Sequence, residues 1–345
     1  MRGMMTDDLN AAIHTYLTTV PASGFAGREV RMAECWRGAE NLLWRVGCAG
    51  QEAAVKLFLD AGQARGRRQF DGQQLFAAAG IAPAPLWFDR YPAGLARQVL
   101  VYRWADGEGI AATEEAMLAQ LAGVAATIHS HPAGDIRRFC PRPVNLDYFW
   151  RVVAGGIEPV QRWCTEMGCD SMAALVEQLG GRAVAVVEQG LPLWQVAPPT
   201  PVHGDLSFAN ALAVGGAVML VDWEMFGLGD PALEVASFLH DSRSALSAAL
   251  LAGWREQYLA ASSDSQIARR IEVYEQLLPL QQLLFLLNGL RRLTAAERAD
   301  SAFHSRRAFL AETLQIATDA AQVALDTVPP DAGGVLSGEV QRLTS

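Results

Sequence analysis

The sequence predicts an α+β protein in which a small, strand-rich N-terminal lobe precedes a larger helical lobe. Up to about Arg103, short apolar runs alternate with Gly and Pro, a pattern typical of strands joined by turns. Beyond that point, apolar residues recur every three or four positions, which is the spacing of amphipathic helices. With 345 residues, of which 51% are apolar, the chain is long enough to bury the cores of two packed lobes.

The N-terminal lobe is predicted to span residues 1–103. Its helix should end at Gly80, because glycine commonly follows the last helical residue and two prolines come soon after. The expected elements are strands at 30–36, 41–48 and 52–58, a helix at 63–79 and a strand at 98–102. Residues 104–108, Trp-Ala-Asp-Gly-Glu, are expected to form a hinge.

The helical lobe is predicted to span residues 104–328. Apolar residues predict helices at 117–128, 146–167, 172–188, 233–242, 246–261, 267–290 and 302–325, with two short strands at 211–214 and 218–222. The glycine pair at 180–181 is expected to break its helix. The tail at 329–345 is rich in Pro, Gly and Ser and is expected to be disordered.

Charge and cysteine content exclude several classes of protein. The formal net charge of −9 argues against a DNA or RNA partner, because such proteins need a basic face. The five cysteines are scattered and form no Cys-x-x-Cys pair, so we expect neither a disulfide framework nor a zinc site, and a reducing cytoplasm fits best. The first ten residues lack the apolar run of a signal peptide, and the apolar stretch at 277–287 is too short and too polar to span a bilayer. We therefore expect no membrane partner.

A polar island, residues 198–231, interrupts the helices and carries the side chains suited to chemistry. Asp205 and Asn210 lie five positions apart in one loop, and Asp222 ends a short strand. Such a set suits phosphoryl transfer, because one Asp can orient and deprotonate a hydroxyl while an Asn and a second Asp bind Mg²⁺ through their oxygens. The order His-x-Asp-x-x-x-x-Asn, then a strand ending in Asp, is that of kinases, with Gly204 in place of Arg.

The island resembles the aminoglycoside phosphotransferase / choline kinase family. His-Gly-Asp-Leu-Ser-Phe-Ala-Asn at 203–210 is similar to the family's His-Gly-Asp-x-x-x-x-Asn, and Val-Asp-Trp-Glu at 221–224 to its Ile/Val-Asp-Trp/Phe-Glu. Gly-Asp-Pro at 229–231 is similar to the continuation of the family motif. The resemblance implies a protein-kinase-like bilobal fold, ATP or GTP as donor, and a small-molecule hydroxyl as acceptor.

The N-terminal lobe extends the resemblance to about residues 30–239. Gly38-Ala-Glu-Asn41 resembles the short turn that covers the nucleotide, and Lys56 in Ala-Val-Lys-Leu resembles the lysine that binds its phosphates. Residues 98–107 resemble the hinge that holds adenine through backbone hydrogen bonds.

One position departs from the family pattern. The family has a Glu in the N-lobe helix that pairs with the strand lysine, where this chain has Gln69. Gln69 can accept a hydrogen bond from Lys56 but brings no charge, and Asp71 would take its place if the helix were shifted. This departure favours, as an alternative of another class, a nucleotide-binding pseudokinase, which the intact Asp205 and Asp222 oppose.

Three further residues of the island have expected roles. We expect His203 to brace the loop by hydrogen bonding and not to take the proton. Asp230 should cap the following helix, with Pro231 at its first position. For Glu224 the sequence leaves two alternatives open, a second metal site or exposure to solvent.

Together these observations predict an ATP-dependent phosphotransferase that phosphorylates a small, amine-bearing alcohol of the aminoglycoside type. Choline, ethanolamine, thiamine and homoserine are alternative acceptors, and neither the choice of ATP or GTP nor the oligomeric state is determined. The predicted site comprises Asp205 as the catalytic residue, Lys56, Gly38, Asn41 and Gln69 at the nucleotide, and Asn210 and Asp222 at Mg²⁺.

Overall fold

The computed structural model describes residues 2–21, 24–38, 40–60, 64–136, 144–327 and 335–344, and its chain divides into two units. Unit 1 consists of residues 1–142, 200–229 and 242–262, and unit 2 of residues 143–199, 230–241 and 263–345. Most of the island therefore folds together with the N-terminal sheet. The sequence predicted two lobes that meet at residue 103. These lobes do not coincide with the two units, and the predicted boundary stays a prediction.

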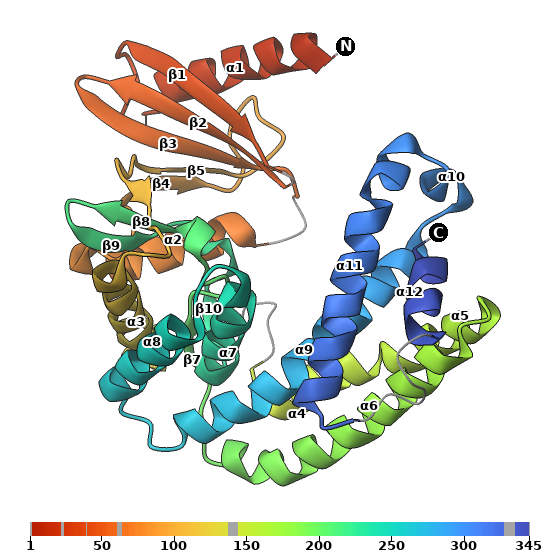
Figure 1. The fold of residues 1–345 in the computed structure, drawn as a ribbon. Coiled ribbons are helices and arrows are strands. Elements are labelled where there is room, and N and C mark those ends of the chain that lie inside the picture. Colours follow the sequence, from red (N-terminus) through yellow and green to blue (C-terminus); the bar gives the residue numbers. More distant parts are fainter. Residues whose placement is uncertain are drawn as a thin grey trace. The chain divides into compact units, whose positions relative to one another are not determined.

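A five-stranded antiparallel sheet begins unit 1, in the order β1-β2-β3-β5-β4 (Figure 1). Its strands are β1 (Val30–Arg37), β2 (Asn41–Cys48), β3 (Gln51–Phe58), β4 (Pro85–Asp89) and β5 (Val99–Arg103). Leu43 of β2 lies opposite Lys56 of β3, which lies opposite Leu100 of β5. Because side chains alternate along a strand, such a row of partners points to one face of the sheet. The strands predicted in this lobe are confirmed, and β4 was not predicted.

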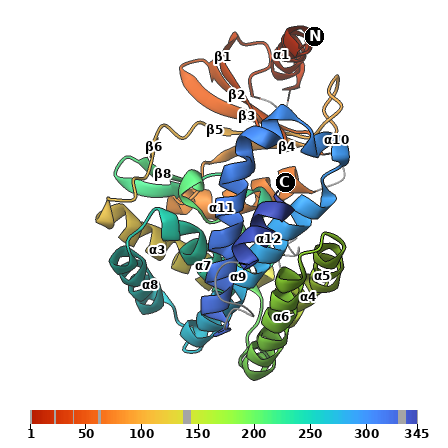
Figure 2. The ribbon, with the colours of Figure 1, turned by 45° about the vertical axis from the view of Figure 1, so that its right-hand side comes forward.

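The rest of unit 1 consists, in its described part, of helices, 3₁₀ turns and two smaller sheets. Its helices and turns are α1 (Arg2–Thr19), α2 (Arg65–Phe76), η2 (Ala77–Ala79), α3 (Glu115–Ser130), η3 (Ala133–Asp135), η5 (Phe208–Asn210), η6 (Trp223–Met225), η7 (Ser242–Ser244) and α8 (Ala248–Ala261). One small sheet joins β6 (Glu108–Gly109), β8 (Ala211–Val214) and β9 (Ala217–Leu220), and the other joins β7 (Thr200–Val202) and β10 (Gly227–Gly229). Helices α3 and α8 lie side by side (Figures 1 and 2).

One face of the large sheet is covered by α1, a helix that the sequence did not predict (Figure 1). Ile13 and Leu17 of α1 belong to one buried cluster with Trp44 and Val46 of β2. The indole N–H of Trp44 donates to Oδ1 of Asn10 at 2.7 Å, so its polar atom is satisfied within the core. This face is therefore structural, and the side chains suited to chemistry lie on the other face.

The other face carries Lys56 and packs against α2. Gly66 allows this approach, since a Cβ at that position would lie 2.8 Å from the ring of Phe88. The helix continues into η2 and ends at Gly80, whose φ of 72° is unfavourable for any residue with a side chain. The predicted end of the helix is confirmed, whereas its predicted start at Gln63 lies outside the described residues.

Unit 2 is helical, with no strand in the residues that the structure describes. Its elements are α4 (Leu146–Ala154), α5 (Ile157–Glu166), α6 (Asp170–Gly190), η4 (Leu191–Trp194), α7 (Pro231–Asp241), α9 (Ile267–Arg292), α10 (Ala295–Arg298), α11 (Ser301–Ala324) and α12 (Val335–Leu343). Helices α9 and α11 run side by side (Figure 2). Asp230 caps α7 as predicted, accepting from the backbone N–H of Ala232 at 3.0 Å, and it also accepts from the hydroxyl of Tyr274 at 2.7 Å.

Two helix predictions are wrong, the single helix at 146–167 and the break at the glycine pair 180–181. The predicted helix at 146–167 breaks at Gly155 and Gly156 into α4 and α5, whereas α6 runs through Gly180 without a break. Gly180 instead lets two helices approach, because a Cβ there would lie 3.1 Å from Cδ1 of Ile157 on α5. A sequence pattern does not distinguish a glycine that ends a helix from one that fits a neighbouring helix.

The tail is a second correction, since residues 335–343 form the helix α12 and not a disordered segment. Leu336, Val340 and Leu343 share one face at helical spacing and are buried. The carboxylate of Glu339 accepts from the backbone N–H of Ser171 at 3.1 Å and also from that of Met172, so it caps the start of α6. The composition of the tail predicted disorder because the burial of these four side chains depends on tertiary contacts, which composition does not show. Residues 328–334 lie outside the described part of the chain.

None of the helices in the described ranges combines the length and the apolar character that a membrane crossing requires.

Candidate active site

Lys56 lies at the centre of a polar cluster on the open face of the large sheet. Its Nζ is 3.0 Å from Oε1 of Gln69, 2.5 Å from Oδ1 of Asp222 and 3.0 Å from Oε2 of Glu224. Burial by itself would lower the pKa of Lys56, but the nearby carboxylates, Asp222 above all, outweigh it and raise that pKa. The cluster therefore holds a charged ammonium group, of which only 5% of the side-chain surface is exposed.

Gln69 is the helix residue that contacts Lys56, and Asp71 is not. Two positions along a helix correspond to a rotation of about 200°, so the two side chains leave α2 on different sides. Gln69 is fully buried, whereas Asp71 forms an ion pair with Arg67 at 2.8 Å on a more exposed side. The choice that the sequence left open is thus decided by which face of α2 is turned to the sheet.

Asp222 follows β9 in a strained backbone conformation. Its φ of 61° and ψ of 55° are left-handed, which costs a residue with a side chain about 1–2 kcal/mol. Such outliers at non-glycine positions cluster at functional sites. One carboxylate oxygen of Asp222 contacts Lys56, while 35% of its side-chain surface is exposed and open to a ligand.

His203 connects the loop of Asp205 to the strand that precedes Asp222. The backbone N–H of Asp205 donates to Nδ1 of His203 at 3.3 Å, so Nε2 carries the proton and donates to the carbonyl of Val221 at 3.0 Å. The imidazole is fully buried. Both ring nitrogens are thereby used within the loop, which is the bracing role expected from the sequence.

Gly204 explains why this loop has glycine where protein kinases have arginine. Its φ is 86°, and a Cβ there would lie 2.3 Å from the carbonyl oxygen of Met225. No side chain fits in that space. The close approach holds the Asp205 loop against the turn η6 that follows Asp222.

Asn210 orients the carboxylate of Asp205. Its Nδ2 donates to Oδ2 of Asp205 at 2.9 Å and to the backbone carbonyl of the same residue at 2.8 Å. Asp205 itself is exposed. In addition, the backbone N–H of Val221 donates to the carbonyl of Asn210 at 2.8 Å, which places Asn210 beside the chain that leads to Asp222.

The oxygen donors of this site fit Mg²⁺. Within the described residues no cluster of three or more His, Cys, Asp or Glu side chains is suited to hold a metal. Mg²⁺ does not require one, because it is commonly bound by one or two carboxylates together with water and substrate phosphates. Asp222 offers a partly exposed carboxylate, and Asn210 offers its amide oxygen because its Nδ2 is engaged with Asp205.

The turn between β1 and β2 is closed by Gly38 and Asn41, two of the residues predicted to lie at the nucleotide. The backbone N–H of Gly38 donates to the carbonyl of Asn41 at 3.0 Å, and a Cβ at Gly38 would lie 2.9 Å from Oδ1 of Asn41. Ala39 lies outside the described residues. The next residue, Glu40, forms an ion pair with Arg65 of α2, which ties the turn to the same cluster.

Glu224 also belongs to the cluster around Lys56. The sequence allowed two roles for it, a second metal site or exposure to solvent. Exposure to solvent is excluded, since only 12% of its side-chain surface is accessible and it pairs with both Lys56 and Arg65. Burial would raise the pKa of Glu224, but the two cations outweigh it and lower that pKa. The sequence signal that points to Glu224 as a site residue is an acidic side chain two positions after Asp222, in the Val-Asp-Trp-Glu run.

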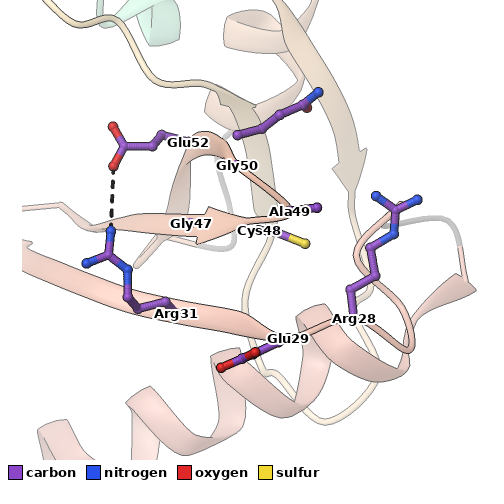
Figure 3. Close-up of a pocket in the computed structure, with 9 residues that line it drawn as sticks. Arg28, Glu29, Arg31, Gly47, Cys48, Ala49, Gly50 and Glu52 are labelled. Atoms are coloured by element: carbon purple, nitrogen blue, oxygen red, sulfur yellow. Dashed lines mark ion pairs between the residues drawn. The ribbon is translucent and has the colours of Figure 1, made fainter.

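A shallow hollow lies elsewhere on the sheet, around the β2–β3 turn (Figure 3). Arg28, Arg31 and Glu52 line it, and the last two form a long ion pair at 3.9 Å. Glu52 precedes Lys56 on β3 by four residues, which corresponds to about 13 Å along a strand. The hollow is therefore separate from the cluster around Lys56.

Comparison with known proteins identifies the family. Residues 32–280 match the model of the phosphotransferase enzyme family, and this segment contains both Lys56 and the whole island. The chain belongs to this family. The phosphotransferase assignment agrees with the resemblance drawn from the motifs, and the enzyme transfers phosphate to a hydroxyl group of a small molecule. Among curated protein sequences, none matches significantly.

Solved structures show the fold of this phosphotransferase. A choline/ethanolamine kinase family protein from Mesorhizobium loti has a TM-score of 0.58 at 15% identity, covering 99% of each chain. An ethanolamine kinase from Plasmodium vivax has a TM-score of 0.58 at 11% identity, covering 92% of this chain and 90% of its own. A thermostable mutant of the aminoglycoside phosphotransferase APH(4)-Ia, in a ternary complex with AMP-PNP and hygromycin B, has a TM-score of 0.57 at 18% identity, covering 91% and 98%. The predicted fold, a small antiparallel sheet followed by a helical region as in kinases, is confirmed.

Proposed function

We propose that this phosphotransferase moves the γ-phosphate of ATP, with Mg²⁺, to a hydroxyl of a small, amine-bearing acceptor. The site residues divide by role into a catalytic carboxylate, metal ligands and nucleotide contacts. They are, in that order, Asp205; Asn210 and Asp222; and Lys56, Gly38, Asn41 and Gln69.

One observation carries this proposal: the loop of Asp205 and the strand end at Asp222 form a single block that reaches Lys56. His203 and Asn210 connect the two segments through Val221, and Asp222 contacts Lys56 at 2.5 Å. Phosphoryl transfer requires a hydroxyl and a phosphate held in line, with the negative charge neutralised, and little covalent chemistry from the protein. A rigid block with one carboxylate for each task meets that requirement.

The carboxylate of Asp205 is suited to receive the proton of the acceptor. Asn210 orients it by donating to its Oδ2, and Asp205 lies at the surface, where its carboxylate can accept a hydrogen bond from the substrate hydroxyl. As the hydroxyl oxygen forms its bond to the γ-phosphorus, its proton passes to Asp205 and the bond to the β-phosphate oxygen breaks, releasing ADP. Mg²⁺, when bound, supplies neutralisation of the charge on the phosphate oxygens.

Two further parts of the proposal are the phosphate donor and the cellular compartment. The structurally similar APH(4)-Ia complex contains AMP-PNP, an ATP analogue, which supports ATP, with GTP as the alternative. The cysteines in the described part of the chain are unpaired, which supports a reducing cytoplasm.

An aminoglycoside is the acceptor class that we place first. The structural neighbours include an aminoglycoside phosphotransferase bound to hygromycin B and choline or ethanolamine kinases. The net charge of −9 favours a cationic acceptor of either kind. Choline, ethanolamine, thiamine and homoserine are therefore the alternatives to test beside aminoglycosides.

A pseudokinase is supported by one feature, the neutral Gln69 beside Lys56. The structure weakens that argument, because Glu224 brings a carboxylate to the same ammonium group at 3.0 Å. Turnover distinguishes the two functions.

The test is ADP release from ATP and Mg²⁺ with a panel of aminoglycosides, choline, ethanolamine, thiamine, homoserine and simple sugars. We expect turnover with one compound class and a loss of about 10²–10⁴-fold in kcat for Asp205→Asn. An Asp319→Asn variant, on an exposed side of α11, is the matched control and should keep full activity. Mg·ATP binding by the wild type without turnover on any acceptor would favour the pseudokinase, and no binding of Mg·ATP would contradict the proposal.

A further inference from the structure

Glu224 contacts two cations of the cluster at once. Its Oε2 lies 3.0 Å from Nζ of Lys56, and its Oε1 lies 2.9 Å from Nη1 of Arg65. Arg65 also pairs with Glu40 in the β1–β2 turn. A continuous chain of charges therefore runs from that turn through α2 to the lysine on β3.

The other partners of Lys56 are less suited to hold it during catalysis. Gln69 is neutral, and a hydrogen bond to a neutral amide is weaker than one between charged groups. Asp222 is charged, but in the proposed function its carboxylate is required by the metal. Glu224 is the remaining contact of Lys56 that is charged and already fixed by a second cation.

The backbone around Glu224 is held firmly against α2. Arg68 donates from Nε to the backbone carbonyl of Glu224 at 2.9 Å. The neighbouring Trp223 is fully buried, and a Cβ at Gly72 of α2 would lie 2.7 Å from its ring, so the helix and the turn are in close contact. The carboxylate of Glu224 is thus placed by packing as well as by charge, which is what precise positioning requires.

We propose that Glu224 is a positioning residue of this phosphotransferase, which supplies from the turn after Asp222 the negative charge that Gln69 lacks and so holds Lys56 toward the nucleotide phosphates. The inference rests on the proposed function in one respect, namely that Lys56 binds those phosphates. The other role that the sequence left open for Glu224 and that its burial does not exclude, a metal ligand, is one outcome of the test.

The decisive experiment transfers the negative charge from position 224 to position 69 on α2. We compare the full-length wild type with Glu224→Gln, Gln69→Glu and the double variant that carries both, measuring kcat and KM for ATP at several Mg²⁺ concentrations. A charge-assisted contact of this kind corresponds to about 10–100-fold in kcat/KM for ATP, which is the loss expected for Glu224→Gln. The double variant should recover to within about threefold of the wild type. Asp71→Asn, which removes a carboxylate from the more exposed side of the same helix, is the matched control and should change nothing.

Rescue by Gln69→Glu separates positioning from a general effect on folding. If Glu224→Gln is as active as the wild type, the proposal is wrong. It is equally wrong if the defect disappears at high Mg²⁺ and is not rescued by Gln69→Glu, because Glu224 would then be a metal ligand. Should Glu224→Gln not fold, Glu224→Asp, which shortens the side chain by one methylene, is compared in the same way.

A measurement without turnover distinguishes failure of this inference from failure of the proposed function. A double-mutant cycle of Lys56→Met and Glu224→Gln measures their coupling in the equilibrium constant for unfolding. We expect non-additivity of about tenfold, whether or not any acceptor is found. Additive effects would overturn the inference, whereas coupling in a protein that does not bind Mg·ATP would overturn only the proposed function.

Discussion

Substituting Gly204 by alanine tests whether the loop of Asp205 is held by a contact that only glycine allows. The residue has a φ of 86°, and the added Cβ would lie 2.3 Å from the carbonyl oxygen of Met225. The neighbour is a backbone atom, so the strain cannot be relieved by rotating a side chain. The loop or the turn η6 must move.

Two contributions set the expected loss of stability. Placing a residue with a side chain in the left-handed region costs about 1–2 kcal/mol. Forcing a methyl group into occupied space costs about 1–3 kcal/mol more, so Gly204→Ala should lower the free energy of unfolding by about 2–5 kcal/mol. A shift of about 1 Å in Asp205 would also lower kcat by about 10²-fold, because in-line transfer depends on exact placement.

Gly216→Ala is the matched control. Gly216 lies in the turn between β8 and β9 with a φ of 84°, and no atom lies within 4 Å of a Cβ built there. The control therefore carries the backbone cost without the collision. Urea unfolding and ADP release measured on both variants isolate the effect of the contact with Met225. Equal losses of stability in the two variants, with full activity for Gly204→Ala, would refute the reasoning.

Three further predictions follow from other parts of the structure. The cations Lys56 and Arg65 lower the pKa of Glu224 against the effect of burial, so its carboxylate stabilises the fold above its ordinary pKa of 4.5 and this contribution is lost as the pH falls through the lower folded value. The gap in stability between wild type and Glu224→Gln, measured by urea unfolding, should therefore narrow below pH 4.5, and a gap that is constant with pH would contradict the assignment. Leu343→Ala in α12 should cost about 2–5 kcal/mol of unfolding free energy because the side chain is fully buried, whereas Val323→Ala, which is 82% exposed, should cost less than about 0.5 kcal/mol; equal costs would argue for a disordered tail. The indoles of Trp36 and Trp104 are stacked with centroids 5.6 Å apart and planes at 13°, so Trp36→Ala should remove an exciton band from the circular dichroism spectrum while Trp163→Ala keeps it, and a band unaffected by Trp36→Ala would exclude the stack.

The chemistry of the island could be predicted from the sequence because it depends on short spacings. Asp205 and Asn210 lie five residues apart in one loop, and the hydrogen bond between their side chains is a local contact. Gly204 marks a backbone that approaches its neighbour closely, and Asp222 follows an apolar strand. Each of these signals lies within a few residues of the group that it positions.

The environment of Lys56 could not be predicted in the same way. Its contact with Asp222 joins residues 166 positions apart, and its contact with Gln69 depends on which face of α2 is turned to the sheet. The contact of Glu224 with Lys56 also joins residues far apart in the chain, so the sequence did not decide between the two roles considered for Glu224.

The sequence by itself determined the fold class, four of the five strands of the large sheet and the loop that carries Asp205, since these depend on periodicity, turn residues and local motifs. Only the tertiary structure decided that Glu224 shares Lys56 with Gln69 and Asp222, that α6 passes through Gly180, and that residues 335–343 of the tail form α12. These features depend on which surfaces pack together, and packing joins residues whose separation in the chain leaves no local pattern.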